Sequence, residues 1–248
     1  MPPSEVLRGV IKAGEGNQLV AFQKLVCAAV ALGSHITTPV LFHCDRSWSP
    51  GDCDENRTVP MTDVLQLSAR THALVSDRPP TRVLTAPYYM KDECGKSGAF
   101  AFSDLVGFSD RVRAYGERLL GSCPSPCMVI QHRAGRDWEW HKRLGTGGSI
   151  EASVVADAAR RWPRHSCVLM APERIDGAAT RCARFKHSRS ETPMVRFLGE
   201  LHAAAHAKVF VYNGHSTVHW IVRRFAQSSL VLDPLRPPRQ ARGHATWH

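Results

Sequence analysis

Short apolar runs alternate with longer segments of helical periodicity along most of this 248-residue chain. Near the start, Leu7–Ile11 and Pro39–Phe42 have the composition of buried strands. The segment 17–32 between them predicts a helix, because apolar residues recur on one face. That face consists of Leu19, Phe22, Val26 and Val30.

The rest of the first half is less regular. Residues 45–65 are polar and rich in Asp, Pro and Ser, which predicts a loop. Thr71–Val75 and Arg82–Leu84 are weaker strand candidates. Ser103–Leu120 predicts a helix that Ser103 caps. Its apolar face consists of Phe108, Val112, Tyr115 and Leu119.

Residues 121–126 interrupt the pattern with Gly, Ser and two prolines, so we place a domain boundary there. The predicted domains are residues 1–122 and 127–248. In the second half the expected strands are Cys127–Ile130, Cys167–Met170, Lys208–Val211 and Leu230–Leu232. The expected helices are Ile150–Arg161, Pro193–Ala205, capped by Thr192 with Pro193 at its first position, and Thr217–Gln227.

Alternation of strands and helices in both halves predicts an α/β fold of two Rossmann-like domains with parallel sheets. In such sheets, ligands bind at the carboxyl ends of strands, where loops lead into helices. The polar segments that follow the predicted strands are therefore the places to look for chemistry.

The net charge of +10 favours anionic partners, but Arg and Lys are dispersed rather than arranged in a stripe with aromatic residues. We therefore expect no nucleic-acid partner. The sequence contains no run of 18 apolar residues, so we expect no membrane span. Met1–Lys12 lacks the pattern of a signal peptide.

The eight cysteines are scattered. Cys27 in a predicted helix and Cys167 in a predicted strand are expected to be reduced core residues. Cys123 and Cys127 have no second close pair, so their spacing does not predict a zinc site. Asn56-Arg57-Thr58 is a glycosylation sequence that has meaning only if the chain enters the secretory route.

Three turns, each directly after a predicted strand, have residues that suit an anionic ligand. The first contains Gly14, Glu15, Gly16 and Asn17, where glycines allow close backbone approach and the next helix offers free N–H groups. The bland alternative is a plain strand-to-helix turn, which short glycine motifs alone do not exclude.

The second turn, residues 131–138, follows a buried strand and contains Arg133, Gly135, Asp137 and Trp138. A fixed guanidinium there can bind two phosphate oxygens at once. The alternative is that Arg133 pairs with Asp137 or is solvated. The third turn places Asn213, Ser216 and Thr217 at a helix start, where they serve either as an anion site or as a helix cap.

Together these residues resemble the GDP-fucose-dependent fucosyltransferases, most closely the protein O-fucosyltransferase type. The first turn resembles that family's glycine-rich turn with Asn. The second resembles its His-x-Arg-x-Gly-x-Asp-Trp stretch, matched by Arg133, Gly135, Asp137 and Trp138. The third resembles its Phe-x-x-Asn-x-x-Ser-Ser/Thr-Phe stretch, matched by Phe210, Asn213, Ser216 and Thr217.

The resemblance implies a GT-B glycosyltransferase that transfers fucose to a hydroxyl of a protein or glycan acceptor, with inversion and without a metal or other cofactor. GDP-fucose would lie in the cleft between the domains, and residues 1–122 would form the acceptor side. The implied donor-binding residues are Gly14, Gly16, Asn17, Arg133, Asp137, Trp138, Asn213, Ser216 and Thr217.

The resemblance also implies catalytic roles for Arg133, at the β-phosphate and glycosidic oxygen, and for Glu15. In some members the Glu of a Gly-Glu-Gly turn is the base, and a carboxylate suits removal of the acceptor proton. An exposed turn residue is the alternative for Glu15. If this sequence lacks a targeting segment that the natural protein has, the resemblance implies the ER or Golgi lumen. Otherwise the expected location is the cytoplasm.

The chain departs from the family pattern at three places. Gln131 stands where the family has histidine, with His132 following it, Val218 stands where an aromatic is expected, and Tyr212 stands where glycine is usual. Gln131 and Val218 keep open a catalytically degraded GDP-sugar-binding protein.

A His-rich metal-binding protein is a further alternative. His202 and His206, like His215 and His219, are spaced one helical turn apart, but neither pair has the Glu of a zinc protease. We expect His202 and His206 on the polar face of their helix. Asp52-Cys53-Asp54 matches the Asp-x-Asp of metal-dependent glycosyltransferases, a tripeptide common by chance.

Overall fold

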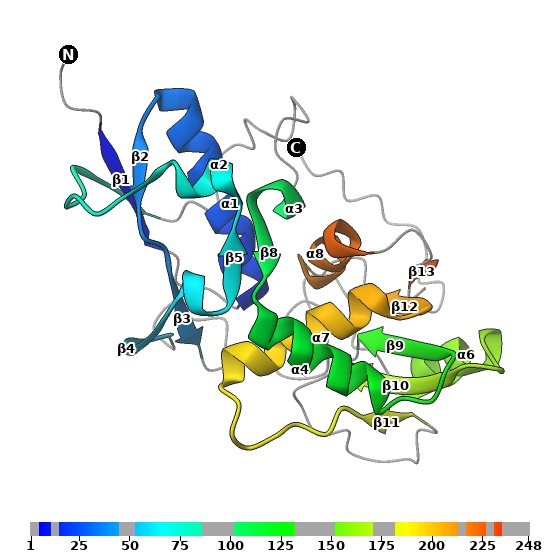
Figure 1. Ribbon diagram of the computed structural model, residues 1–248. Coiled ribbons are helices and arrows are strands. Elements are labelled where there is room, and N and C mark those ends of the chain that lie inside the picture. The colour runs from blue at the N-terminus through cyan, green and yellow to red at the C-terminus, as the bar shows by residue number, and fades with distance from the viewer. Residues whose placement is uncertain are drawn as a thin grey trace.

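In this computed structural model, the residues described are 5–10, 15–44, 53–85, 102–131, 152–170, 182–212, 217–226 and 231–234. Figure 1 shows two separate parallel sheets, one from each half of the chain, with helices α4, α7 and α8 between them. The prediction of an α/β fold with parallel sheets is confirmed.

The first sheet has the strand order β6-β2-β1-β7, and each of its pairings is parallel. Its strands are β1 (Val6–Val10), β2 (His35–Thr37), β6 (Val75–Ser76) and β7 (Arg82–Thr85). Helix α1 (Glu15–Leu32) connects β1 to β2. The expected apolar face of α1 is buried at Leu19, Phe22 and Val26, whereas Val30 is 36% exposed near the helix end.

The second sheet has the order β11-β10-β9-β12-β13 and is also parallel throughout. Its strands are β9 (Cys127–Gln131), β10 (Ser166–Met170), β11 (Ala183–Arg184), β12 (Val209–Tyr212) and β13 (Val231–Pro234). The helices of this half are α6 (Ala152–Arg161), α7 (Pro193–His206) and α8 (Thr217–Phe225). As expected, the Thr192 hydroxyl caps α7 by accepting a hydrogen bond from the Val195 N–H.

Strand β9 is central in its sheet, and all five of its residues are buried. Met128 and Ile130 pack with α6 residues in one apolar cluster, whereas Val129 belongs to a larger cluster on the other face. This alternation explains why the strand reads as an uninterrupted apolar run, since helices cover both faces of the sheet. The larger cluster also contains Phe22 of α1, so a single core joins the two halves.

The predicted loop at 45–65 is partly wrong. Residues 53–60 form strand β4 (Cys53–Pro60), which pairs antiparallel with β3 (Val40–Cys44). A short 3-10 helix, Met61–Asp63, and strand β5 (Leu65–Leu67) follow. The strand expected at Pro39–Phe42 therefore exists, but it belongs to an antiparallel pair outside the parallel sheet.

Two further predictions are corrected. Thr71–Val75 is not a strand, because α2 (Ala69–His72) is capped by the Ser68 hydroxyl and only Val75–Ser76 is extended. The single helix expected over Ser103–Leu120 is instead α3 (Phe102–Leu105), strand β8 (Val106–Phe108) and α4 (Asp110–Gly121). The cap of α4 is Ser109, whose hydroxyl accepts from the Val112 N–H. β8 pairs antiparallel with β5, and this pairing supplies hydrogen bonds that a continuous helix would forgo.

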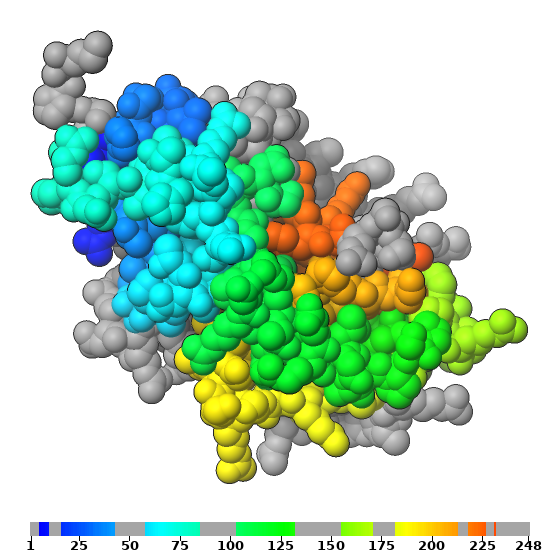
Figure 2. Space-filling view, in the orientation of Figure 1, coloured from blue at the N-terminus to red at the C-terminus, as the bar shows by residue number. Residues whose placement is uncertain are grey.

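Helix α4 ends where the expected boundary, residues 121–126, begins, but it packs extensively against α7 of the second half. The contact is close because glycines face each other. A Cβ at Gly116 would lie 2.6 Å from His202 Cδ2 and 2.8 Å from the Gly199 carbonyl oxygen, and a Cβ at Gly199 would overlap the Tyr115 ring. Figure 2 shows residues 102–131, in green, crossing the visible face between the blue and cyan residues from earlier in the chain and α8, in orange. The domain division itself stays a prediction.

The sequence predicts that His202 lies on the polar face of α7, but its side chain is buried. It is 4% exposed, and its ring lies edge-on to Phe108 at 5.5 Å between centroids and 4.0 Å from the ring of His206. Burial, followed by the charges of His206 and Arg113, lowers the pKa of His202 to about 4. His202 is therefore a neutral packing residue at neutral pH.

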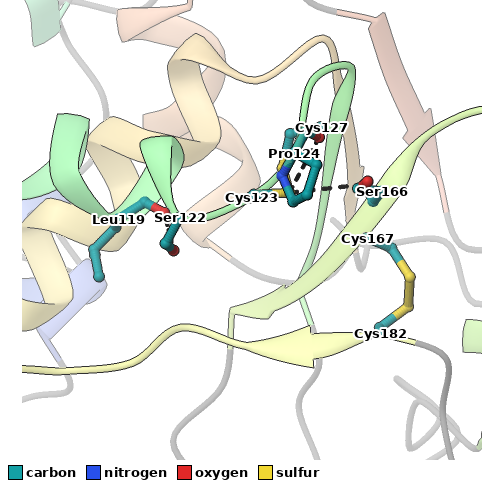
Figure 3. The surroundings of a disulfide bond; sticks show 8 residues. All are labelled: Leu119, Ser122, Cys123, Pro124, Cys127, Ser166, Cys167 and Cys182. Atoms are coloured by element: carbon teal, nitrogen blue, oxygen red, sulfur yellow. Dashed lines mark hydrogen bonds between the residues drawn. A yellow bond between two sulfur atoms is a disulfide. The ribbon is translucent and has the colours of Figure 1, made fainter.

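The expectation of reduced cysteines is also wrong. Cys167 forms a disulfide with Cys182, and Cys123 forms one with Cys127 (Figure 3). Cys27 is disulfide-bonded as well. The Cys123–Cys127 bond encloses the turn that leads from α4 into β9, and the other bond joins β10 to the residue before β11.

The segment 185–192, with a turn at residues 189–190, is held against α4 and α7. The Tyr115 hydroxyl lies 2.9 Å from His187 Nδ1, and His187 Nε2 lies 2.9 Å from Glu200 Oε1. Farther along, Glu191 pairs with Arg111 at 2.9 Å. These contacts add polar links to the apolar α4–α7 interface.

Replacing Gly116 by alanine should destabilise the protein by about 1–3 kcal/mol, because the added methyl group meets the backbone of α7. Gly121→Ala is the matched control, since a Cβ at Gly121, in the same helix, meets nothing within 4 Å. That variant should be unchanged or up to about 1 kcal/mol more stable. Denaturant unfolding of both variants measures the difference, and equal stabilities would contradict the close α4–α7 packing.

Candidate functional site

Two of the three predicted turns start from neighbouring strand ends. Strands β9 and β12 are adjacent and parallel, with Val211 opposite Ile130. The chain therefore leaves Gln131 and Tyr212 at the same edge of the second sheet, and it carries the Arg133 segment and the Asn213–Thr217 segment from that edge. This is the carboxyl edge, where parallel α/β sheets bind ligands.

The first turn lies at the start of α1, and α1 packs against α8, the helix that follows the third turn. Within the described part of this turn, Gly16 is buried and Asn17 is partly exposed. Glu15 opens α1 and Thr217 opens α8. The N-terminal ends of helices attract anions, since their first N–H groups have no partner within the helix.

Most of the predicted site residues lie outside the described residues: Gly14, Arg133, Gly135, Asp137, Trp138, Asn213 and Ser216. Of Glu15 and Thr217, only the backbone is described. Their roles stay predictions, and the described strands and helices define only the segments from which these residues extend.

Gln18 is a buried residue of the first turn region that sequence reasoning missed. Its side-chain Nε2 donates to the Phe42 carbonyl oxygen at 2.8 Å, and its Oε1 accepts from the Phe42 N–H at 2.8 Å. The side chain thus bonds to β3 as a neighbouring strand would, and it ties the start of α1 to the antiparallel pair β3–β4. Its position one turn before Phe22, on the buried face of α1, was the available signal.

Tyr212 and His219 form a second feature that the sequence did not reveal. Tyr212 ends β12, His219 is in the first turn of α8, and their rings stack with centroids 4.6 Å apart. Both side chains are partly exposed, and they flank residues 213–216. The stack fixes the orientation of α8 relative to β12 at the candidate site.

Two of the three departures from the family pattern, Gln131 and Val218, are core positions, whereas Tyr212 is partly exposed. Gln131 is 2% exposed at the end of β9, and strand alternation places it on the same face as Val129. Val218 is 7% exposed and belongs to the large apolar cluster. Their side chains therefore pack between the second sheet and its helices.

The metal-binding alternatives find little support in the described part of the chain. His206 Nδ1 lies 2.9 Å from the His202 carbonyl oxygen, within its own helix. Among the described residues, no three His, Cys, Asp or Glu side chains gather in a way that could hold a metal ion. Asp52 and His215 lie outside those residues.

No family model matches the chain, and no curated protein matches it in sequence. Solved structures do match. The structure of POFUT1 in complex with GDP superimposes with a TM-score of 0.62 at 10% identity, over 95% of this chain and 99% of that one. POFUT1 in complex with GDP-fucose gives a TM-score of 0.62 at 10% identity, over 95% and 98% of the two chains. A second GDP complex gives 0.59 at 12% identity over 95% and 99%.

These structures establish the fold. The chain has the GT-B arrangement expected from the resemblance to protein O-fucosyltransferases, over nearly its full length. Within the part of the chain that the structure describes, no helix is long and apolar enough to cross a membrane.

Gln18→Leu should destabilise the protein by about 2–4 kcal/mol, because the Phe42 N–H and carbonyl each lose a buried hydrogen-bond partner. Gln66→Leu makes the same substitution at an exposed position of β5 and should have a small effect. Thermal or denaturant unfolding measures both. If the two substitutions cost the same, the bond between α1 and β3 does not stabilise the fold.

Proposed function

We propose that this protein is a glycosyltransferase that transfers fucose from GDP-fucose to a hydroxyl of a protein or glycan, with inversion and without a metal. The observation that carries the proposal is the adjacency of β9 and β12. These strands end at one edge of the second sheet, and the Arg133 segment and the Asn213–Thr217 segment follow them in the sequence, in a fold shared with POFUT1. POFUT1 was solved with GDP and with GDP-fucose.

In this proposal, Arg133 binds the β-phosphate and the glycosidic oxygen, and its charge stabilises the GDP leaving group. Ser216 and Thr217 bind phosphate at the start of α8, and Asn213, Asp137 and Trp138 contact the nucleotide. The positive end of the α8 dipole adds to the same stabilisation.

Glu15 is the proposed base. Its carboxylate takes the proton of the acceptor hydroxyl while that oxygen attacks the anomeric carbon, and the bond from this carbon to the phosphate oxygen breaks. The acceptor approaches from the α1 side, where Gly14, Gly16 and Asn17 bind the donor. The products are the fucosylated acceptor and GDP.

A GDP-sugar-binding protein without turnover is the second candidate. It is favoured by Gln131 and Val218, which replace the histidine and the aromatic residue of the family pattern and are buried here. The +10 charge suits the anionic donor in either case.

We also propose an oxidising compartment, in keeping with the ER or Golgi lumen rather than the cytoplasm. The support is that Cys27, Cys123, Cys127, Cys167 and Cys182 are disulfide-bonded. Structural disulfides persist in secretory compartments and are rare in the cytosol, where glutathione and thioredoxin reduce them.

Calorimetric titration in EDTA should show tighter binding of GDP than of UDP or GMP. GMP lacks the β-phosphate that Arg133 is proposed to bind, and UDP carries a different base. Equal affinities for the three nucleotides would contradict the donor assignment. Loss of GDP binding in EDTA would contradict metal independence.

Arg133→Ala should lower the rate of GDP release from GDP-fucose about 10²–10³-fold, by removing a charge from the developing phosphate anion. Arg136→Ala is the matched control in the same segment and should retain activity. Coupled GDP detection, with unfolding curves of both variants, measures the effect. An active Arg133→Ala protein refutes the catalytic role, whereas a wild-type protein that binds GDP without turnover identifies the second candidate.

A further inference from the structure

Strand β4 carries the Asn56-Arg57-Thr58 sequence, which has no part in the proposed transferase site. The chain has three asparagines, at 17, 56 and 213, and Asn56 alone is followed by x-Ser/Thr. Any N-linked glycan on this chain would therefore be attached at Asn56.

The pairing of β4 with β3 is interrupted at this sequence. Thr58 lies opposite Phe42, and the next pair along the strand is Asp54 with His43. No described residue of β3 pairs with residues 55–57. These three residues form a bulge, and Asn56 is at its centre. A bulge leaves its extra residues outside the ladder of strand hydrogen bonds, so the Asn56 backbone is not fixed by β3.

The hydroxyl residue of the sequence is accessible. Thr58 is exposed, and Val59 beside it turns inward against the core. In Figure 1, β4 lies far across the molecule from β9 and β12, where the proposed donor site begins.

The disulfides supply the independent observation. A glycosylation sequence is used only in a chain that enters the secretory route, and the disulfide-bonded cysteines indicate an oxidising compartment of that kind. The bulge and the exposed Thr58 make the sequence reachable, and the compartment provides the enzyme that reads it.

We propose that Asn56 carries an N-linked glycan. Its amide nitrogen displaces the lipid diphosphate of a polyprenyl-diphosphate-linked oligosaccharide. The nitrogen–carbon bond to the first sugar forms, the bond from that carbon to the phosphate oxygen breaks, and the amide loses one proton to the enzyme's base. The proposal rests on the compartment proposed above and is independent of the fucosyltransfer reaction.

The test is expression of the full chain behind a secretory signal in cultured animal cells, followed by analysis of the secreted protein. Wild type should show a one-glycan mass shift that peptide N-glycosidase F removes, with conversion of Asn56 to Asp in the mass spectrum. Asn56→Gln and Thr58→Ala should abolish the shift. Thr58→Ser is the matched control and should retain it, because serine supplies the same hydroxyl.

Secreted protein that contains the Cys123–Cys127 disulfide but has unmodified Asn56 would overturn the proposal. Persistence of the shift in Asn56→Gln would also overturn it. GDP binding by the Asn56→Gln protein should equal that of wild type, so that failure of the glycan proposal and failure of the donor assignment give different results.

Discussion

The close approach of α4 to α7 is the contact on which the arrangement of the two halves depends. Gly116 and Gly199 let the helix backbones come near enough for Tyr115 and His202 to fill the space beside them. Because α4 leads directly into β9, this contact also fixes where the central strand of the second sheet starts. The larger apolar cluster then continues from α1 through α4 and α7 to the second sheet. The absence of side chains at Gly116 and Gly199 therefore controls how the sheet of the first half is positioned relative to the sheet of the second half.

The strands and helices with strong, single periodicities were predictable from the sequence. Strand β9 is apolar from Cys127 to Ile130 because both faces are covered, and α7 starts at Pro193 because Thr192 caps it. The errors arose where tertiary pairing overrides local pattern. Strand β8 interrupts a helical pattern because its backbone bonds to β5, and polar β4 is extended because β3 pairs with it. Neither pairing leaves a signal within its own segment.

The candidate site was predictable in position more than in detail. Strand–turn–helix alternation located the turns after β9 and β12, and parallel pairing places their starting points side by side. The Gln18 bonds to Phe42 were not predictable, since they depend on a strand 24 residues away. The disulfides were missed for the same reason, because spacing alone does not bring Cys167 to Cys182.

The α4–α7 contact also constrains the order of events during synthesis. Helix α4 ends at Gly121, and α7, which covers it, is complete only at His206. At 5–20 residues per second, the ribosome takes roughly 4–17 seconds to add the intervening ~85 residues. During that interval, Tyr115 and the neighbouring apolar residues of α4 lack the helix that buries them. The nascent chain therefore passes through a stage at which a chaperone or the first half alone must shield α4 from aggregation.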